Sequence, residues 1–241
     1  MISKTRGVVL HSIKYGDSSL IVHVYTEKYG RQSFMVSGVR GRKGKNKASF
    51  FMPLSLLDLE IYYKPKRDMQ RISETRILIP FHDIPFHIDK NTIALFISEI
   101  LYKVLKEHEE NPPLFEFLLN AIGFLDVYEG NIANFHLVFL MNLSRFLGFY
   151  PNVETYEDGY YFDLKNGSFK KSVPYHPNYL EKKQSVLFRE LLSVNFSNFQ
   201  AYHPTGKERK GLLELVINYF GLHIESLGNI NSYRILKEVF N

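Results

Sequence analysis

The sequence of 241 residues contains no cysteine and no tryptophan. Without cysteine, disulfide bonds, thiol nucleophiles and cysteine-based zinc or iron–sulfur sites are excluded. The nine histidines are scattered and form no HExxH pairing, so we expect neither a metal site nor a cofactor. No apolar run reaches the roughly 20 residues that a membrane-spanning helix needs, and no signal-peptide core is present near the N-terminus. These absences favour a cytoplasmic protein that does not enter membranes.

Motifs for nucleotide hydrolysis and acyl transfer are also missing. A phosphate-binding loop requires GxxxxGK followed by Ser or Thr. The near matches at residues 44–46 and 206–208 lack that hydroxyl residue, and no GxSxG motif occurs. Acidic pairs such as Glu109 and Glu110 stand in no metal or glycosidase pattern. We therefore expect a protein that is not an enzyme, and an enzyme of unrecognised type is the least favoured alternative.

Positive charge is concentrated in one part of the chain. Residues 1–80 carry 15 Lys and Arg against 6 Asp and Glu, which gives +9. Residues 81–241 carry 15 against 19, which gives −4, and the two parts sum to the formal charge of +5. A basic part beside a mildly acidic part indicates a polyanion-binding surface in the first 80 residues.

The basic part shows the two-residue period of β-structure. Alternating apolar residues predict strands at about 7–10, 20–25, 34–36, 57–63 and 69–79, with turns between them. Five short strands in this length predict a small closed barrel, either an OB-fold or, nearly as well, an SH3-like barrel. We expect a two-domain α+β protein, with a five-stranded OB-fold barrel at 1–80 and a mostly α-helical domain at 81–241.

Beyond Pro80 the apolar residues recur at three- and four-residue steps, which is typical of amphipathic helices. Helices are expected from a cap at 89–91 to about 105, from Asn111-Pro112 towards residue 130, and at about 132–147. Others are expected at about 178–194, 205–220 and 232–240. Between them, residues 152–173 predict a metal-free β-hairpin with an Asn166-Gly167 turn.

The densest group of cations lies at residues 40–47, where five cations accompany two glycines and no acidic residue. A solvated loop is the alternative interpretation. However, the loop belongs to a basic barrel, and glycine lets backbone amides approach a phosphate closely. We therefore expect this part to bind nucleic-acid backbone. The candidate cations are Arg6, Lys28, Arg31, Arg40, Arg42, Lys43, Lys45, Lys47, Lys64, Lys66 and Arg67.

Aromatic residues that stack on bases are harder to choose, because most of the 20 Phe and 16 Tyr are expected in the core. Phe34 alternates with apolar residues and is expected to be buried. Tyr29 and Phe50 are the better surface candidates for base stacking.

Taken in order, several short motifs resemble the RecO family of bacterial recombination mediators. They are GVVL at 7–10, YGDSSL at 15–20, YTEKYG at 25–30 and SGVR at 37–40, followed by LGFYP at 147–151, YFD at 161–163 and GSF at 167–169. The apolar pattern at 212–222 and the short helix at 233–240 also match. Each motif is weakly specific, but their order and spacing cover nearly the whole chain.

The resemblance implies an N-terminal OB-fold and a C-terminal helical domain. It further implies binding of single- and double-stranded DNA, annealing of complementary strands, and help in loading recombinase onto strands coated with single-strand-binding protein. The implied partners are RecR and the acidic C-terminal tail of single-strand-binding protein, with RecF and a recombinase filament as further possibilities. No catalytic residue is implied.

The chain departs from many members of the family at one place. Those members carry four cysteines around the region that matches 152–178, and these bind zinc. Here Thr155 to Asp158 and Val173 to Tyr175 stand near the expected positions. The resemblance therefore implies a hairpin held by its aromatic residues (Tyr160, Tyr161, Phe162 and Phe169).

A site for the acidic tail would need an apolar pocket with a cation at its rim. Arg145, among Phe139, Phe146 and Phe149, is the candidate, although a surface role for Arg145 is a close alternative. The basic barrel also suits a second function, an RNA-binding OB-fold protein of translation or RNA metabolism, because single-strand stacking platforms do not inherently distinguish RNA from DNA.

Overall fold

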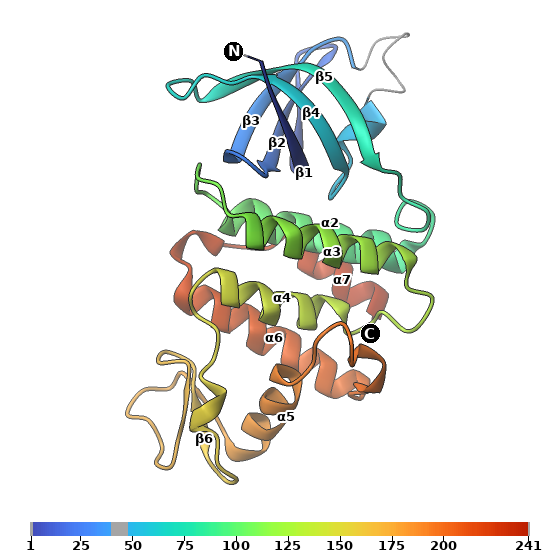
Figure 1. The fold of residues 1–241 in the computed structure, drawn as a ribbon. Helices are drawn as coiled ribbons and strands as arrows, with labels where there is room; N and C mark the ends of the chain where they lie inside the picture. The colour runs from blue at the N-terminus through green and yellow to red at the C-terminus, as the bar shows by residue number, and fades with distance from the viewer. Residues whose placement is uncertain (1, 40–47, 241) are drawn as a thin grey trace. The chain divides into compact units, whose positions relative to one another are not determined.

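The computed structural model describes residues 2–39 and 48–240. The chain divides into two compact units, whose elements are shown in Figure 1. The first unit comprises Met1–Val127 together with Ile230–Tyr233. The second comprises Tyr128–Asn229 together with Arg234–Asn241.

Five strands of the first unit close into a barrel in the order β1-β2-β3-β5-β4, and β4 pairs back to β1. The strands are β1 Ile2–Tyr15, β2 Ser19–Thr26, β3 Gly30–Val36, β4 Leu56–Tyr62 and β5 Met69–Ile79. Neighbours are antiparallel, except that β3 and β5 pair in parallel over a short stretch. The predicted five-stranded barrel is confirmed, and its arrangement is consistent with an OB-fold.

Strand β1 is longer than its apolar run at 7–10 predicts. Its first part pairs with β4, and from Gly7 onward it pairs with β2, with an irregularity between Val9 and His11. Because polar residues interrupt the apolar pattern at both ends of β1, hydrophobicity alone predicts a shorter strand. Gly7 has a steric role here, because a Cβ atom at this position would lie 2.6 Å from Cγ1 of Val24 in the barrel core.

The barrel encloses a small apolar core. Its buried members come from β1 to β4, from the residue Val39 after β3 and from the short 3-10 helix η1 Ser49–Phe51: Val9, Leu20, Val22, Val24, Phe34, Val39, Phe51, Leu57, Leu59 and Ile61. Phe34 is among them, as its alternation predicted. Strand β5 adds Ile72 and Ile77, which are partly buried against this core. Burial of these side chains supplies the main stabilisation of the barrel.

Two helices, α2 Ile88–Val104 and α3 Pro112–Val127, complete the first unit and lie side by side next to the barrel (Figure 1). Helix α2 packs on β1, where the Ser98 hydroxyl donates to the Leu10 carbonyl. The predicted start of α3 is confirmed, since Oδ1 of Asn111 accepts a hydrogen bond from the Leu114 amide at 3.1 Å.

The second unit contains helices α4 Phe135–Phe146, α5 Lys182–Leu192 and α6 Gly206–His223, together with most of α7 Ser232–Phe240. Short 3-10 helices lie at η2 Val153–Thr155, η3 Phe199–Ala201 and η4 Glu225–Leu227. Helix α5 begins later than the predicted residue 178, because Tyr179–Leu180 forms strand β8 instead. Backbone pairing with β6 takes the place of the first helical turn.

The predicted hairpin is present as β6 Tyr161–Asp163 and β7 Ser168–Lys170, and β8 adds a third strand in the order β7-β6-β8. Asn166 and Gly167 lie in the connecting turn as predicted, and the turn has four residues, because Asp163 pairs with Ser168. The Asp163 carboxylate accepts hydrogen bonds from the amides of Lys165 and Asn166 at 2.9 and 3.0 Å. An acidic residue at the strand end therefore shapes the turn.

Aromatic rings of this small sheet pack against one another and against neighbouring elements. The Phe162 ring lies 4.8 Å from both Phe169 and Phe188, measured between centroids, and Tyr156 meets Phe169 edge-on at 5.0 Å. Phe162 and Phe169 are buried, whereas Tyr160 and Tyr161 are partly exposed. Among residues 2–39 and 48–240, no group of three or more His, Asp or Glu is arranged to hold a metal ion.

Every helix in the described part of the chain is too short or too polar to cross a lipid bilayer.

Candidate nucleic-acid interface

The predicted cations of the barrel include one group that is bound by carboxylates or carbonyls of the protein and a second group that is exposed and forms no ion pair with the described residues. At the end of the barrel formed by the β2–β3 turn, Arg6 donates to both carboxylate oxygens of Glu27, at 2.7 and 3.0 Å. Its guanidinium also contacts the Glu116 carboxylate of α3 at 2.5 Å. The hydrogen bonds that Arg6 donates to Glu27 raise the pKa of Arg6 above its ordinary value, and they lower the pKa of Glu27. The charge of Arg6 is thus balanced within the molecule.

Arg31 is likewise engaged inside the first unit. Its Nη1 donates to the carbonyl oxygens of Tyr102 and Leu105, at 3.0 and 3.4 Å, and its guanidinium lies 4.4 Å from the centroid of the Tyr102 ring. These carbonyls belong to the last turn of α2, which lacks intrahelical donors and attracts cations. Arg31 therefore caps α2 and holds it against β3.

Tyr29 has one face covered. Its ring stacks on Tyr63 at a centroid distance of 3.8 Å, and its hydroxyl is hydrogen-bonded to Oγ of Ser3 at 2.7 Å. The half-buried ring also packs against the barrel core. Lys28, the preceding residue, is exposed.

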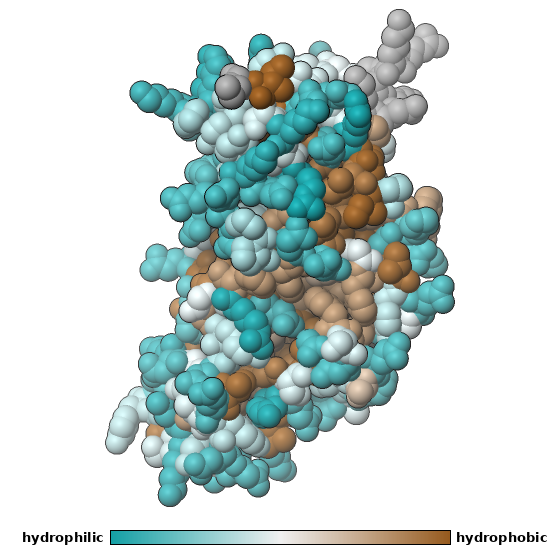
Figure 2. Space-filling view, in the orientation of Figure 1, coloured by the Kyte–Doolittle hydropathy of each residue, from teal (hydrophilic) through white to brown (hydrophobic). Residues whose placement is uncertain are grey.

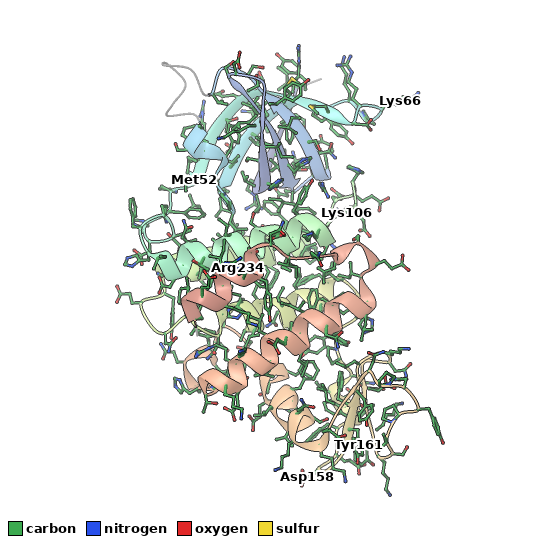
Figure 3. The ribbon with its side chains drawn as sticks, turned by 180° about the vertical axis from the view of Figure 1, so that it is seen from behind. Met52, Lys66, Lys106, Asp158, Tyr161 and Arg234 are labelled. Carbon is green, nitrogen blue, oxygen red and sulfur yellow. The ribbon has the colours of Figure 1, made fainter. Side chains whose placement is uncertain are left out.

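The second group lies on the turn between β4 and β5. Lys64, Lys66 and Arg67 are exposed there and form no ion pair with any residue of the described ranges. Lys66 projects from the tip of this turn (Figure 3). The buried Gln70 shapes the turn: its carboxamide accepts from the Lys64 amide at 2.9 Å and donates to the carbonyls of Lys64 and Arg67 at 2.9 and 2.8 Å.

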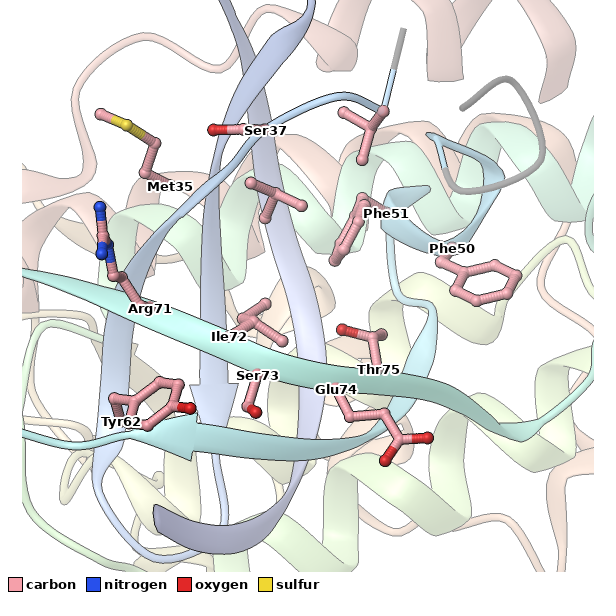
Figure 4. A pocket seen from close by; sticks show the side chains of 12 residues that line it. Met35, Ser37, Phe50, Phe51, Tyr62, Arg71, Ile72, Ser73, Glu74 and Thr75 are labelled. Carbon is pink, nitrogen blue, oxygen red and sulfur yellow. The ribbon is translucent and has the colours of Figure 1, made fainter. Parts of the chain in front are cut away.

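A groove of about 640 Å³ runs along β5 beside the end of β3 and η1. It begins where the short parallel pairing of β3 and β5 ends. Figure 4 shows the side chains around it, which include Arg71, Ser73 and Thr75 of β5 and Ser37 after β3. Phe50 lies at its edge and is half-buried. The groove combines hydroxyls, a cation and aromatic rings, a set that suits a nucleic-acid strand.

A smaller hollow of about 330 Å³ adjoins the cationic turn and is lined by Tyr62, Lys64, Arg67, Met69, Gln70 and Arg71. On the face shown in Figure 2, apolar side chains gather over the end of β5 near η1, whereas hydrophilic side chains surround the β4–β5 turn. The basic turn and the groove therefore share strand β5.

Sequence reasoning missed Arg71 and Tyr62, although both line the two hollows. Arg71 forms no ion pair with the described residues, whereas Arg76 further along β5 binds Glu74 at 2.7 Å. Simple alternation on β5 could not assign Arg71 to a face, because the register of β5 shifts opposite Glu60 and Ile61. Only the pairing of Arg71 with Met35 of β3 and Tyr62 of β4 shows that it lies beside the groove.

Five predicted cations, Arg40, Arg42, Lys43, Lys45 and Lys47, lie outside the described residues. The chain on either side of them is placed: Val39 precedes them and Phe50 follows shortly after, and both residues line the groove.

The candidate partner site on α4 is differently arranged from the predicted pocket. Arg145 is exposed, and its guanidinium lies 3.6 Å from the centroid of the Tyr150 ring. Phe149 instead packs on α6, at 5.0 Å from Phe220, and Phe139 is fully buried. Phe146 is half-buried. The structure therefore places the Tyr150 ring against the Arg145 guanidinium, whereas Phe149 packs on α6 and Phe139 is in the core.

Comparison with known proteins agrees with this architecture. Residues 1–81 match the family described as Recombination protein O N terminal, and residues 85–232 match Recombination protein O C terminal. A DNA repair protein RecO of Phocaeicola vulgatus is 39% identical over 241 residues and covers 100% of both chains. The proteins of that name from Bacteroides fragilis and Flavobacterium psychrophilum are 40% and 36% identical, over 100% and 99% of each chain. With both family domains present in order and relatives aligned from end to end, this chain belongs to the RecO family of recombination and DNA repair proteins.

Proposed function

We propose that this protein is a non-enzymatic DNA-binding mediator of recombinational repair. It binds single- and double-stranded DNA through the barrel at 1–80, anneals complementary single strands, and helps to load recombinase onto DNA coated with single-strand-binding protein. The observation that carries the proposal is the set of cations on one side of the barrel that have no carboxylate partner among the described residues, next to a groove of suitable chemistry. Family membership supports the role in repair.

Phosphate contacts are assigned first to Lys64, Lys66, Arg67 and Arg71, which are exposed and unpaired within the described ranges. The loop cations Arg40, Arg42, Lys43, Lys45 and Lys47 extend this set, since their segment joins two residues of the groove. Arg6 and Arg31 contribute less to binding, because their charges are already used within the first unit. Cations that release counterions from DNA make the affinity strongly dependent on salt.

The proposed protein partners are RecR, the acidic C-terminal tail of single-strand-binding protein, and in some reactions RecF and the recombinase filament. They would contact the helical part at 81–241, with Arg145, Phe146 and Phe149 on or near the candidate surface for the acidic tail. DNA binding of this kind places the protein at the nucleoid.

The proposal is tested with charge reversal and an annealing assay. Arg40, Arg42 and Lys43 changed together to Glu should abolish binding to a labelled single strand, and Lys64, Lys66 and Arg67 changed to Glu should weaken it at least about tenfold. The wild-type protein should anneal complementary oligonucleotides, and single-strand-binding protein without its acidic tail should block this annealing on coated strands. If both charge-reversed proteins bind DNA as tightly as the wild type at low salt, the assigned interface is wrong.

A competition between DNA and RNA oligonucleotides of one sequence addresses the RNA-binding alternative. Preference for RNA together with no annealing of DNA strands would contradict the proposed function.

A further inference from the structure

The pairing of the barrel strands aligns six residues in a single row that runs across all five strands. Ile13 pairs with Ile21, Ile21 with Met35, Met35 with Arg71, Arg71 with Tyr62, and Tyr62 with Ile2. Directly paired residues point to the same face of a sheet. Their sequence neighbours Leu20, Phe34 and Ile61 are buried in the barrel core. The row therefore crosses the strands on the outer surface of the barrel.

This row is apolar and yet exposed. Ile2, Ile13, Met35 and Tyr62 retain 49%, 42%, 37% and 46% of their accessible surface. Large apolar side chains that are contiguous on a surface mark a site of interaction. The only charged member is Arg71, which is exposed and has no carboxylate partner in the described part of the chain.

Tyr62 and Arg71 stand between the two hollows of the barrel. Both residues line the groove of about 640 Å³ and the hollow of about 330 Å³. Figure 4 shows Arg71 between Met35 and Tyr62 along one side of the groove. A flat group that enters either hollow meets the aromatic ring and the guanidinium together.

The surrounding charge selects the kind of ligand. Lys64 and Arg67 share the smaller hollow with the row. The acidic residue of the larger groove, Glu74, is neutralised by Arg76 at 2.7 Å. An apolar row beside unpaired cations fits a polyanion that also exposes flat apolar groups. A single nucleic-acid strand has both features, whereas a duplex keeps its bases inside.

We propose that Met35, Arg71 and Tyr62 form a stacking row for unpaired bases, over which a single strand runs across β3, β5 and β4, and that the Arg71 guanidinium in this row also neutralises one adjacent phosphate. This inference rests on the proposed function, since it takes DNA as the ligand of the barrel. It adds that the barrel distinguishes single strands from duplexes by contact with bases. Aromatic and guanidinium planes stack on bases without regard to sequence.

The test compares three fluorescent ligands of equal charge by anisotropy: an oligothymidine, an abasic oligomer with the same backbone, and a hairpin duplex. Tyr62→Ala should weaken binding of oligothymidine about 5- to 150-fold, the range expected for the loss of one stacked base. Binding of the abasic oligomer and the duplex should stay within about twofold. Tyr62→Phe should bind like the wild type, because the ring is kept, and Met35→Ser should act like Tyr62→Ala with a smaller effect.

Tyr175→Ala serves as the matched control, because Tyr175 is a fully exposed tyrosine of the second unit. Thermal unfolding confirms that each variant is folded. Equal weakening of all three ligands by Tyr62→Ala, or no weakening of any, would overturn the stacking row. Failure of the wild-type protein to bind any of the three at low salt would instead overturn the proposed function.

Discussion

Lys90 of α2 and Asp126 of α3 join the two helices of the first unit. The Lys90 ammonium donates to the Asp126 carbonyl oxygen at 2.7 Å, in a site where both residues are buried. It also pairs with the Asp83 carboxylate at 2.7 Å and thereby lowers the pKa of Asp83. The Asp126 carboxylate accepts hydrogen bonds from the backbone amides of residues 82–84 at 2.8 to 3.0 Å. These contacts fix the connection between the barrel and α2.

The carboxylate of Asp126 should therefore be important for stability. Asp126→Ala leaves three backbone donors without their acceptor, and we expect a loss of about 3 kcal/mol or more in the free energy of unfolding. Urea denaturation measures it. Asp158→Ala, at an exposed acidic position, is the control and should change stability by less than about 0.5 kcal/mol. A loss at Asp126 as small as that of the control would contradict this account.

Gly30 of the β2–β3 turn should resist substitution for a steric reason as well as a conformational one. It has φ +56°, and a Cβ atom there would lie 2.5 Å from the carbonyl oxygens of Glu107 and Glu109. Gly16 has a similar φ of +58°, but a Cβ atom there would have no non-neighbouring atom of the described residues within 4 Å. Gly16→Ala should cost about 1–2 kcal/mol from backbone conformation alone. Gly30→Ala should lower the free energy of unfolding clearly more than Gly16→Ala in the same denaturation experiment. Equal losses would show that residues 107–109 move aside at little energetic cost.

Two histidines between the barrel and α2 should make stability depend on pH. His11 and His23 pack on the Tyr102 ring, with centroids 4.7 and 5.0 Å away. Burial lowers the pKa of both, that of His23 to about 4, and the nearby Arg31 acts in the same direction. Because the unfolded chain binds these protons near pH 6.5 and the folded chain does not, stability is full above that pH and falls between pH 6.5 and 4.

The size of the His23 contribution is about 1–2 kcal/mol once solvent screening of this half-exposed ring is allowed for. It is measured as the slope of unfolding free energy against pH. His23→Gln should flatten the slope between pH 6.5 and 4. His136, buried in the second unit with a lowered pKa, contributes a slope of the same sign and remains in this variant. An unchanged slope in His23→Gln would refute the assignment.

Arg71 and Arg76 allow a matched test of DNA binding on one strand. Arg76 is paired with Glu74, whereas Arg71 has no ion pair among the described residues. Arg71→Ala should weaken binding and reduce the slope of log affinity against log salt by about 1, as expected for one lost phosphate contact. Arg76→Ala should leave that slope unchanged. The reverse order of effects would place the DNA on another face of the barrel.

Much of the architecture follows from local patterns. The two-residue period through 20–25, 34–36 and 57–63 predicted the strands, because one face of each strand had to enter the barrel core. The three- and four-residue steps after Pro80 predicted the helices for the same reason. Residues 179–180 were misassigned to a helix, because two residues are too few for a period and their partner strand is distant in sequence.

The candidate site was less accessible to sequence reasoning. The sequence shows Arg6, Arg31 and Lys66 only as three positive charges, and it does not show which of them is available to bind DNA. Whether a cation is available depends on carboxylates and carbonyls brought to it from elsewhere in the chain. Glu116 is 110 residues from Arg6, and the Tyr102 carbonyl is 71 residues from Arg31.

The sequence by itself determined the fold class, the placement of positive charge in the first 80 residues and the absence of cysteine chemistry, because composition and short-range periodicity act locally. Only the tertiary structure decided which cations stay unpaired, which aromatic rings remain exposed and that Met35, Arg71 and Tyr62 share a row. Those properties arise from strand register and long-range contacts, and no local pattern encodes them.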